Sequence, residues 1–91
     1  MIYRIYTEDV NTEETIKTVS RYFDCYTLFR AVGFWLGEKE NSLCFEIVGN
    51  TPSEIQGNFM DKATAVAREI KTLNKQQAVL VVSLPASAIT V

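Results

Sequence analysis

Residues 26–48 contain two strand-like segments joined by a short charged cluster, a pattern that few folds other than a sheet can accommodate. The first segment, Tyr26 to Leu36, is dense in residues that favour strands and is interrupted by Gly33. The polar residues Glu38 to Asn41 follow it and predict the turn of a β-hairpin. In the second segment, Ser42 to Val48, side chains should alternate between the two faces of a strand. One face would carry Leu43, Phe45 and Ile47, and the other Cys44, Glu46 and Val48.

A strand and a helix are predicted before the hairpin. Ile2 to Thr7 is short and rich in β-branched and aromatic residues, which favours a strand. Thr12 can cap a helix, and the acids Glu13 and Glu14 that follow suit the positive end of a helix dipole. We expect this helix to run from about Thr12 to Asp24.

A second helix and a last strand are predicted after the hairpin. Residues 51–54, Thr-Pro-Ser-Glu, have the pattern of a capping box with proline at the first helical position. The continuous apolar run from Ala78 to Leu84 predicts a strand buried on both faces, and Ala86 to Val91 a short edge strand. Between residue 54 and Ala78, apolar residues recur every three or four positions, as on one face of a helix: Ile55, Phe59, Ala63, Val66, Ile70 and Leu73.

The predicted element order is β-α-β-β-α-β. With two right-handed crossovers, this order gives an α+β fold of the ferredoxin-like kind. Its four-stranded antiparallel sheet would have the spatial order four, one, three, two, with both helices on one face. Residues 1–91 would form a single domain, because a chain of this length has no room for a second core.

The sheet face without helices has consequences for assembly. None of the second, third and fourth strands has a wholly polar set of alternating side chains, so the uncovered face would expose apolar area. Self-association through this face is the simplest way to cover it. We therefore expect a homo-oligomer with a possible small ligand or protein partner.

Composition argues against several classes of function. The net charge is −2 and the basic residues are scattered, which argues against a nucleic-acid partner. The chain has no His, and its two cysteines lack CxxC spacing, so we expect no metal, no cofactor and no catalytic residue. The N-terminus lacks the pattern of a secretory signal and no apolar run is long enough to span a membrane, which predicts a cytoplasmic protein.

Four residues are candidates for binding a ligand or partner. Trp35, the only tryptophan, could stack on a ligand at the open face or in a subunit cleft, although packing is the more ordinary role. Arg30 and Glu46 lie in otherwise apolar strands and could form a polar pair in a pocket, or simply a cross-strand ion pair. Tyr26 could orient a ligand, although tyrosines more often pack with an exposed hydroxyl.

Three functions are compatible with this sequence. We expect first a non-enzymatic binding protein of regulatory or viral-inhibitor type. The architecture is similar to that of trimeric signalling proteins of the nitrogen-regulatory and metal-tolerance type, a likeness of fold alone because their ligand motifs are not visible here. The alternative is a cofactor-independent enzyme of the dimeric ferredoxin-like barrel type. The second alternative is an RNA-binding sheet that stacks bases on Tyr3, Tyr6 and Phe45.

Overall fold

A computed structural model describes residues 1–49, 59–86 and 89 of the chain. In this part of the chain, four strands and two helices follow the order that the sequence predicts. They are β1 (Ile2–Glu8), α1 (Thr12–Ser20), β2 (Thr27–Trp35), β3 (Glu38–Val48), α3 (Met60–Asn74) and β4 (Leu80–Leu84).

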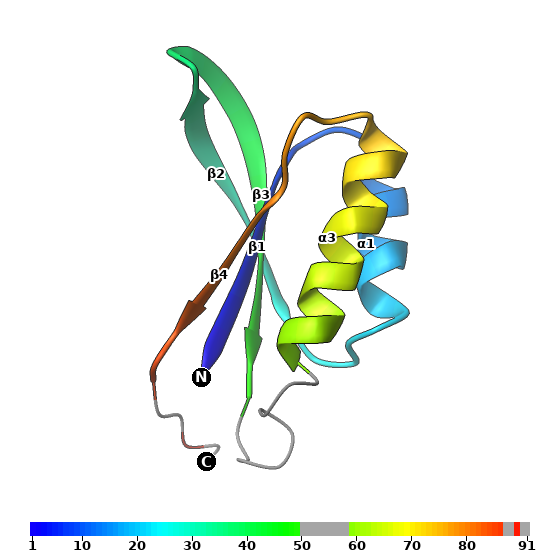
Figure 1. Cartoon of the computed structure of the whole chain (residues 1–91), viewed down its shortest axis with the longest axis vertical. Helices are drawn as coiled ribbons and strands as arrows, with labels where there is room; N and C mark the ends of the chain where they lie inside the picture. The colour runs from blue at the N-terminus through cyan, green and yellow to red at the C-terminus, as the bar shows by residue number, and fades with distance from the viewer. Residues whose placement is uncertain (50–58, 87–88, 90–91) are drawn as a thin grey trace.

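The strands form one antiparallel sheet in the order β2-β3-β1-β4, and α1 and α3 cover one of its faces (Figure 1). The predicted α+β, ferredoxin-like arrangement is therefore confirmed, including the spatial order of the strands. Among the described residues, no helix is long and apolar enough to cross a membrane.

The core lies between the sheet and the two helices. Ile5 on β1 stands opposite Phe45 on β3 and Val81 on β4, and both Ile5 and Phe45 are fully buried. Val66 and Ile70 on α3 and Val19 on α1 close this core from the helix side. Burial of these side chains, at about 1.5–3 kcal/mol each, is the main favourable term in folding.

The two helices end where local hydrogen bonds redirect the chain. Helix α1 stops at Ser20, short of the predicted Asp24, and the amide of Phe23 donates to the carbonyl of Val19 at 3.0 Å, which brings the Phe23 ring into the core. At the end of α3, Lys75 adopts a left-handed conformation with φ 53°, and the Gln76 amide reaches back to Lys71 at 3.0 Å. This is the Schellman pattern of a helix end. The predicted start of the second helix at residues 51–54 lies outside the described residues.

The hairpin turn differs from the prediction. Trp35 pairs with Glu38, so the turn consists of Leu36 and Gly37, and both residues have positive φ, 51° and 80°. Positive φ at both central residues matches the type I′ turn of two-residue hairpins, and Gly37 adopts it without a steric cost. The turn predicted at residues 38–41 was wrong, because those charged residues alternate along β3 rather than forming a loop.

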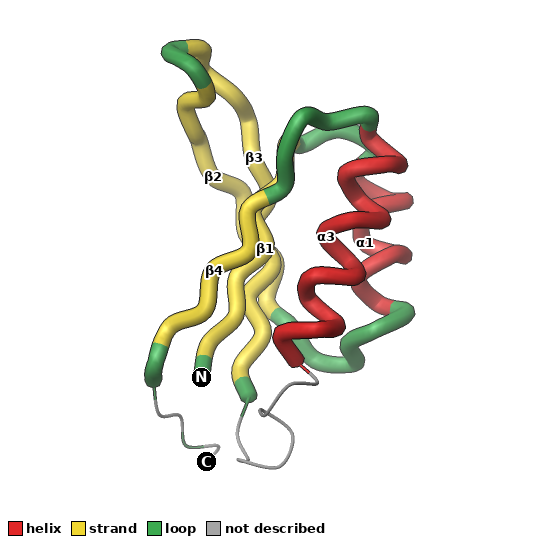
Figure 2. The backbone as a smooth tube through the Cα atoms, viewed as in Figure 1, coloured by secondary structure: helices red, strands yellow, loops and turns green. Residues whose placement is uncertain are grey.

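The outer half of this hairpin projects from the body of the sheet. Pairing between β1 and β3 ends where Glu8 meets Ser42, so residues 38–41 pair with β2 alone. We call residues 32–41 the hairpin arm. It is a two-stranded ribbon that extends beyond the other strands (Figure 2).

Strand β4 lies at the sheet edge, as the predicted strand order requires, but it is not buried on both faces as expected. It pairs only with β1, and Leu80 is 58% exposed. The apolar run misled the prediction because the side of β4 that faces away from the helices is left open. Ala86 lies outside any strand, and residues 87–88 and 90–91 of the predicted tail strand are not among the described residues.

Candidate ligand cleft

The open face of the sheet is polar at one end. The register places Tyr6 of β1 between Leu80 of β4 and Cys44 of β3 on this face. The next positions toward the hairpin arm are Glu8 of β1, which pairs with Ser42, and then Glu40 and Glu38 of β3, which pair with Gly33 and Trp35. Acidic and aromatic side chains are thereby gathered where the arm leaves the sheet.

A cleft of about 660 Å³ occupies this end of the open face. The hairpin arm forms one wall, the connection between α3 and β4 (residues 75–79) forms the other, and the end of β1 forms the floor. This volume is within the range of about 300–1,000 Å³ that small-molecule sites occupy. The cleft is lined by Tyr6, Thr7, Glu8, Gly33, Phe34, Trp35, Leu36, Glu38, Glu40, Ser42, Lys75, Gln76, Gln77, Ala78, Val79 and Leu80.

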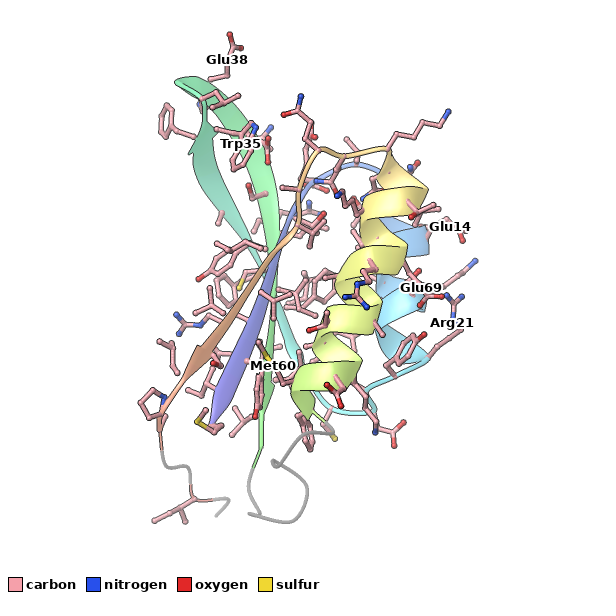
Figure 3. All side chains as sticks on the ribbon, in the orientation of Figure 1. Glu14, Arg21, Trp35, Glu38, Met60 and Glu69 are labelled. Atoms are coloured by element: carbon pink, nitrogen blue, oxygen red, sulfur yellow. The ribbon has the colours of Figure 1, made fainter. Side chains whose placement is uncertain are left out.

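Trp35 joins the two walls of the cleft. Its indole Nε1 donates a hydrogen bond to Oε1 of Gln77 at 3.3 Å. Figure 3 shows the ring on the side of the arm that faces the α3–β4 connection, with Glu38 at the end of the arm. Trp35 is 49% exposed, so much of the indole remains available to contact a ligand.

Gly33 lies in the arm wall of the cleft, close to the neighbouring strand β3. A Cβ atom at this position would stand 3.2 Å from Oγ of Ser42 on the neighbouring strand. That separation is shorter than an ordinary van der Waals contact, so a larger residue here would require the Ser42 side chain to shift.

The charge of the cleft favours a cation. Glu8, Glu38 and Glu40 line it, against the single base Lys75. Burial raises the pKa of the Glu40 carboxyl, and the negative charge of Glu8 raises that pKa further. A bound cation near these carboxylates would relieve their mutual repulsion.

Hydrogen bonds fix the α3–β4 connection to the body of the domain. The hydroxyl of Thr7 donates to Oε1 of Gln76 at 2.6 Å, and Nδ2 of Asn74 donates to the same oxygen at 3.3 Å. Asn74 Nδ2 also lies 3.4 Å from Oγ1 of Thr15 on α1. This wall of the cleft is therefore tied to both β1 and α1.

The structure separates the four residues proposed from the sequence. Trp35 lines the cleft, and Glu46 lies on the same sheet face but outside the cleft, where its Oε2 accepts a hydrogen bond from Nε of Arg4 at 2.9 Å. Arg30 lies on the other face and pairs with Asp9. The Tyr26 ring packs on Phe45 with centroids 5.6 Å apart, and its hydroxyl is 2.7 Å from Oγ of Ser20. No Arg30–Glu46 pair exists, and the binding roles of the four residues stay predictions.

The aromatic platform required by an RNA-binding sheet is not assembled. Tyr3 and Phe45 are buried under the helices, with exposed fractions of 3% and 0%, and only Tyr6 of the three lies on the open face. Arg4 of that face is already paired with Glu46.

Sequence reasoning missed the acidic residues of the cleft. Glu38 and Glu40 continue the alternation of Ser42, Cys44 and Glu46 along β3, but the misplaced turn assigned them to a solvated loop. Among the described residues, no group of three or more His, Cys, Asp or Glu side chains is arranged to hold a metal ion.

Comparison with known proteins gives matches at the level of structure. No family model matches the sequence, and no curated protein matches it. A phage SAM lyase in complex with S-methyl-5′-thioadenosine superimposes with a TM-score of 0.69 and 17% sequence identity, covering 88% of this chain and 76% of the lyase chain. The apo state of a phage SAM lyase matches with a TM-score of 0.65 and 18% identity, covering 88% and 75%.

These matches establish a shared fold, and they overturn one expectation. The sequence predicts a non-enzymatic binding protein of regulatory or viral-inhibitor type. The two solved structures described above share this fold and are of a lyase, a finding that contradicts the expectation of a non-enzymatic binding protein. Of the expectations drawn from the sequence, the alternative of a cofactor-independent enzyme agrees better with this finding.

Proposed function

We propose that the chain is a lyase that cleaves S-adenosylmethionine (SAM), or a closely related sulfonium nucleoside, in the cleft between the hairpin arm and the α3–β4 connection. The observation that carries the proposal is the cleft itself, which joins aromatic and acidic side chains in a fold shared with a SAM lyase. SAM carries a flat adenine ring and a sulfonium cation, and these two groups are the ones that such a cleft can bind.

The aromatic residues suit the adenine ring. Stacking of a nucleobase on an aromatic side chain contributes about 1–3 kcal/mol. Trp35 offers an indole in the wall of the cleft, and Tyr6 offers a phenol ring on its floor. The sulfonium would lie close to aromatic faces and to the carboxylates of Glu8 and Glu40, both of which attract cations.

The cleavage can be written with balanced atoms and no added reactant. The bond between sulfur and Cγ of the amino-acid portion breaks, its electron pair stays on sulfur, and neutral S-methyl-5′-thioadenosine leaves. The substrate's own carboxylate can attack Cγ and close a lactone, or a base can remove a proton from Cβ and form an alkene. The first route needs no base from the protein, whereas Glu40 is the candidate base for the second because its raised pKa favours proton uptake.

The acidic residues should contribute more to binding than to the displacement route. The positive charge of sulfur disappears as the bond breaks, so a carboxylate near sulfur stabilises the substrate more than the transition state. Removal of one such charge should therefore raise KM, with kcat unchanged or slightly higher, if the lactone forms. A fall in kcat for Glu40→Gln would indicate the elimination route.

The test is a turnover assay. The purified chain is incubated with SAM, and S-methyl-5′-thioadenosine and the four-carbon product are quantified by liquid chromatography and mass spectrometry. We expect product in proportion to protein concentration and, at SAM concentrations below KM, a large loss of rate in the double variant Trp35→Leu/Glu40→Gln. Product formation at the rate of a protein-free control, at SAM concentrations up to the millimolar range, would refute the proposal.

We also propose that the chain forms a homo-oligomer through the open sheet face. Exposed apolar side chains on this face outside the cleft support the proposal, since Phe29 is 40% exposed and Val48 38%. Light scattering coupled to size-exclusion chromatography measures the mass directly, and a monomer across a range of micromolar concentrations would contradict it. The cytoplasmic location expected from the sequence stays a prediction.

A further inference from the structure

The hairpin arm has few attachments to the rest of the domain. Its residues 38–41 pair with β2 alone, and Val32, Phe34 and Leu36 are 58%, 72% and 82% exposed. At its base, the Asp9 amide donates to the Asn41 carbonyl at 2.8 Å. An isolated two-stranded ribbon is only marginally stable in water, so the position of the arm depends on contacts made farther out.

One side-chain hydrogen bond crosses the cleft within the described part of the chain, from Trp35 Nε1 to Gln77 Oε1. The segment that carries the acceptor Gln77 is held by hydrogen bonds to the body of the domain. The neighbouring residue Gln76 accepts hydrogen bonds from Thr7 and Asn74, and the Schellman turn at Lys75 sets the direction in which the connection leaves α3. Gln77 therefore extends from an anchored segment of the chain toward an arm that has few attachments of its own.

We propose that Gln77 is a positioning residue. It holds the Trp35 indole, and with it the hairpin arm, at the distance from the α3–β4 connection at which a flat nucleobase fits in the cleft. This inference rests on the proposed function for the identity of the ligand. Gln77 acts through Trp35 and not on the reacting atoms. Its loss should leave the chemical step intact and weaken the binding of any ligand that stacks on the indole.

The discriminating variants are Gln77→Met and Gln77→Glu. Methionine has nearly the same length but no oxygen to accept the indole N–H, whereas the carboxylate of glutamate retains the acceptor. From the usual net contribution of one hydrogen bond, KM for SAM should rise about two- to ten-fold in Gln77→Met, with kcat within about two-fold of the parent. Gln77→Glu should keep KM closer to the parent. Arg68→Met, on the exposed side of α3, is the matched control and should change neither constant.

A second measurement needs no substrate. Trp35 is the only tryptophan of the chain, so its fluorescence reports on the cleft wall alone. In the unliganded protein, Gln77→Met should make Trp35 easier to quench with acrylamide and lower its steady-state anisotropy, while Gln77→Glu and Arg68→Met stay like the parent. Circular dichroism of each variant shows whether the fold is retained.

The two measurements separate failure of the inference from failure of the proposed function. If the parent chain cleaves SAM and Gln77→Met leaves KM unchanged, the positioning role is refuted and the function stands. If the parent neither cleaves SAM nor binds S-methyl-5′-thioadenosine, the function fails. In that case the quenching experiment alone tests the positioning role of Gln77. Equal quenching in Gln77→Met and the parent refutes that role.

Discussion

Replacement of Trp35 by leucine should weaken binding of S-methyl-5′-thioadenosine without unfolding the domain. The indole forms part of the cleft wall and is 49% exposed, so part of its surface is accessible for contact with the adenine ring. Loss of a base–aromatic stack costs about 1–3 kcal/mol, which corresponds to about 5- to 150-fold in the dissociation constant. Leucine keeps an apolar side chain at the site but offers no flat surface and no N–H donor.

The stability of this variant should change little. About half of the Trp35 surface is already in contact with water, and leucine retains part of the remaining burial. The free energy of unfolding should therefore fall by less than about 1 kcal/mol, as is usual for substitutions away from the core. Thermal melts followed by circular dichroism provide this check before binding is measured.

Isothermal titration calorimetry with S-methyl-5′-thioadenosine is the assay, and Phe29→Leu is the control. Phe29 lies on the same strand and the same sheet face as Trp35, is 40% exposed, and does not line the cleft. Because Phe29 also lies on the face proposed for self-association, light scattering first shows that the control and the parent have the same mass. The control should bind within about two-fold of the parent. Equal affinity of Trp35→Leu and the parent, or equal loss in both variants, would refute the stacking role of Trp35.

Three further predictions concern the cleft and the core. Because burial and Glu8 raise the pKa of Glu40 in the folded protein, the stability linked to this group is present at low pH and is lost as pH rises through the folded pKa. The melting temperature of Glu40→Gln minus that of the parent should therefore increase as pH rises from about 4 to about 7. A difference that stays constant or falls over this range would contradict the prediction. Cys25 is exposed, whereas Cys44 is buried, and burial raises the pKa of the Cys44 thiol. Iodoacetamide should therefore label only Cys25 in the native protein. Peptide mass spectrometry that finds Cys44 modified at a similar rate would exclude this packing. Ile5→Val should lower the free energy of unfolding by about 0.5–1.5 kcal/mol and the melting temperature by about 2–10 °C, because Ile5 is fully buried, and an unchanged melt would argue against its place in the core.

The fold could be predicted from the sequence because its signals are local and mutually consistent. Alternation along β3 and helical spacing along α3 each specify one element, and the order of the elements leaves few topologies. The length of α1 was overestimated because Phe23 continues the apolar spacing, although it reaches the core from the turn that follows the helix. The exposure of Leu80 on β4 was missed because a continuous apolar run favours burial on both faces, although the predicted strand order places this strand at an edge of a sheet with one open face.

The site was harder to predict because it depends on the register of the hairpin. A turn at Leu36 and Gly37 places Glu38 and Glu40 on the face of Trp35, whereas a loop at residues 38–41 removes them from the sheet. A positive φ at Leu36 has no residue signature, so the tight turn was missed. Register decides which side chains share a face, and an error in it rearranges every cross-strand pair.

The separation of Arg30 from Glu46 was, in contrast, available from the sequence. A hairpin loop with an even number of residues places even-numbered residues of one strand opposite odd-numbered residues of the other. Arg30 and Glu46 therefore fall on opposite faces with either a two-residue or a four-residue loop, as the structure shows. Their actual partners, Asp9 and Arg4, come from the segment around β1, and such long-range pairs could not be identified without the order of the strands.

The most direct test of the account is a map of the ligand site by nuclear magnetic resonance. S-methyl-5′-thioadenosine is titrated into the ¹⁵N-labelled chain, and shifts of backbone amides and of the single indole N–H are followed. We predict saturable shifts that are largest at the Trp35 indole and at the amides of Tyr6, Gly33 and Ala78, which surround the cleft. Absence of shifts at millimolar ligand, or shifts confined to the helices, would contradict the assignment of this cleft as the site.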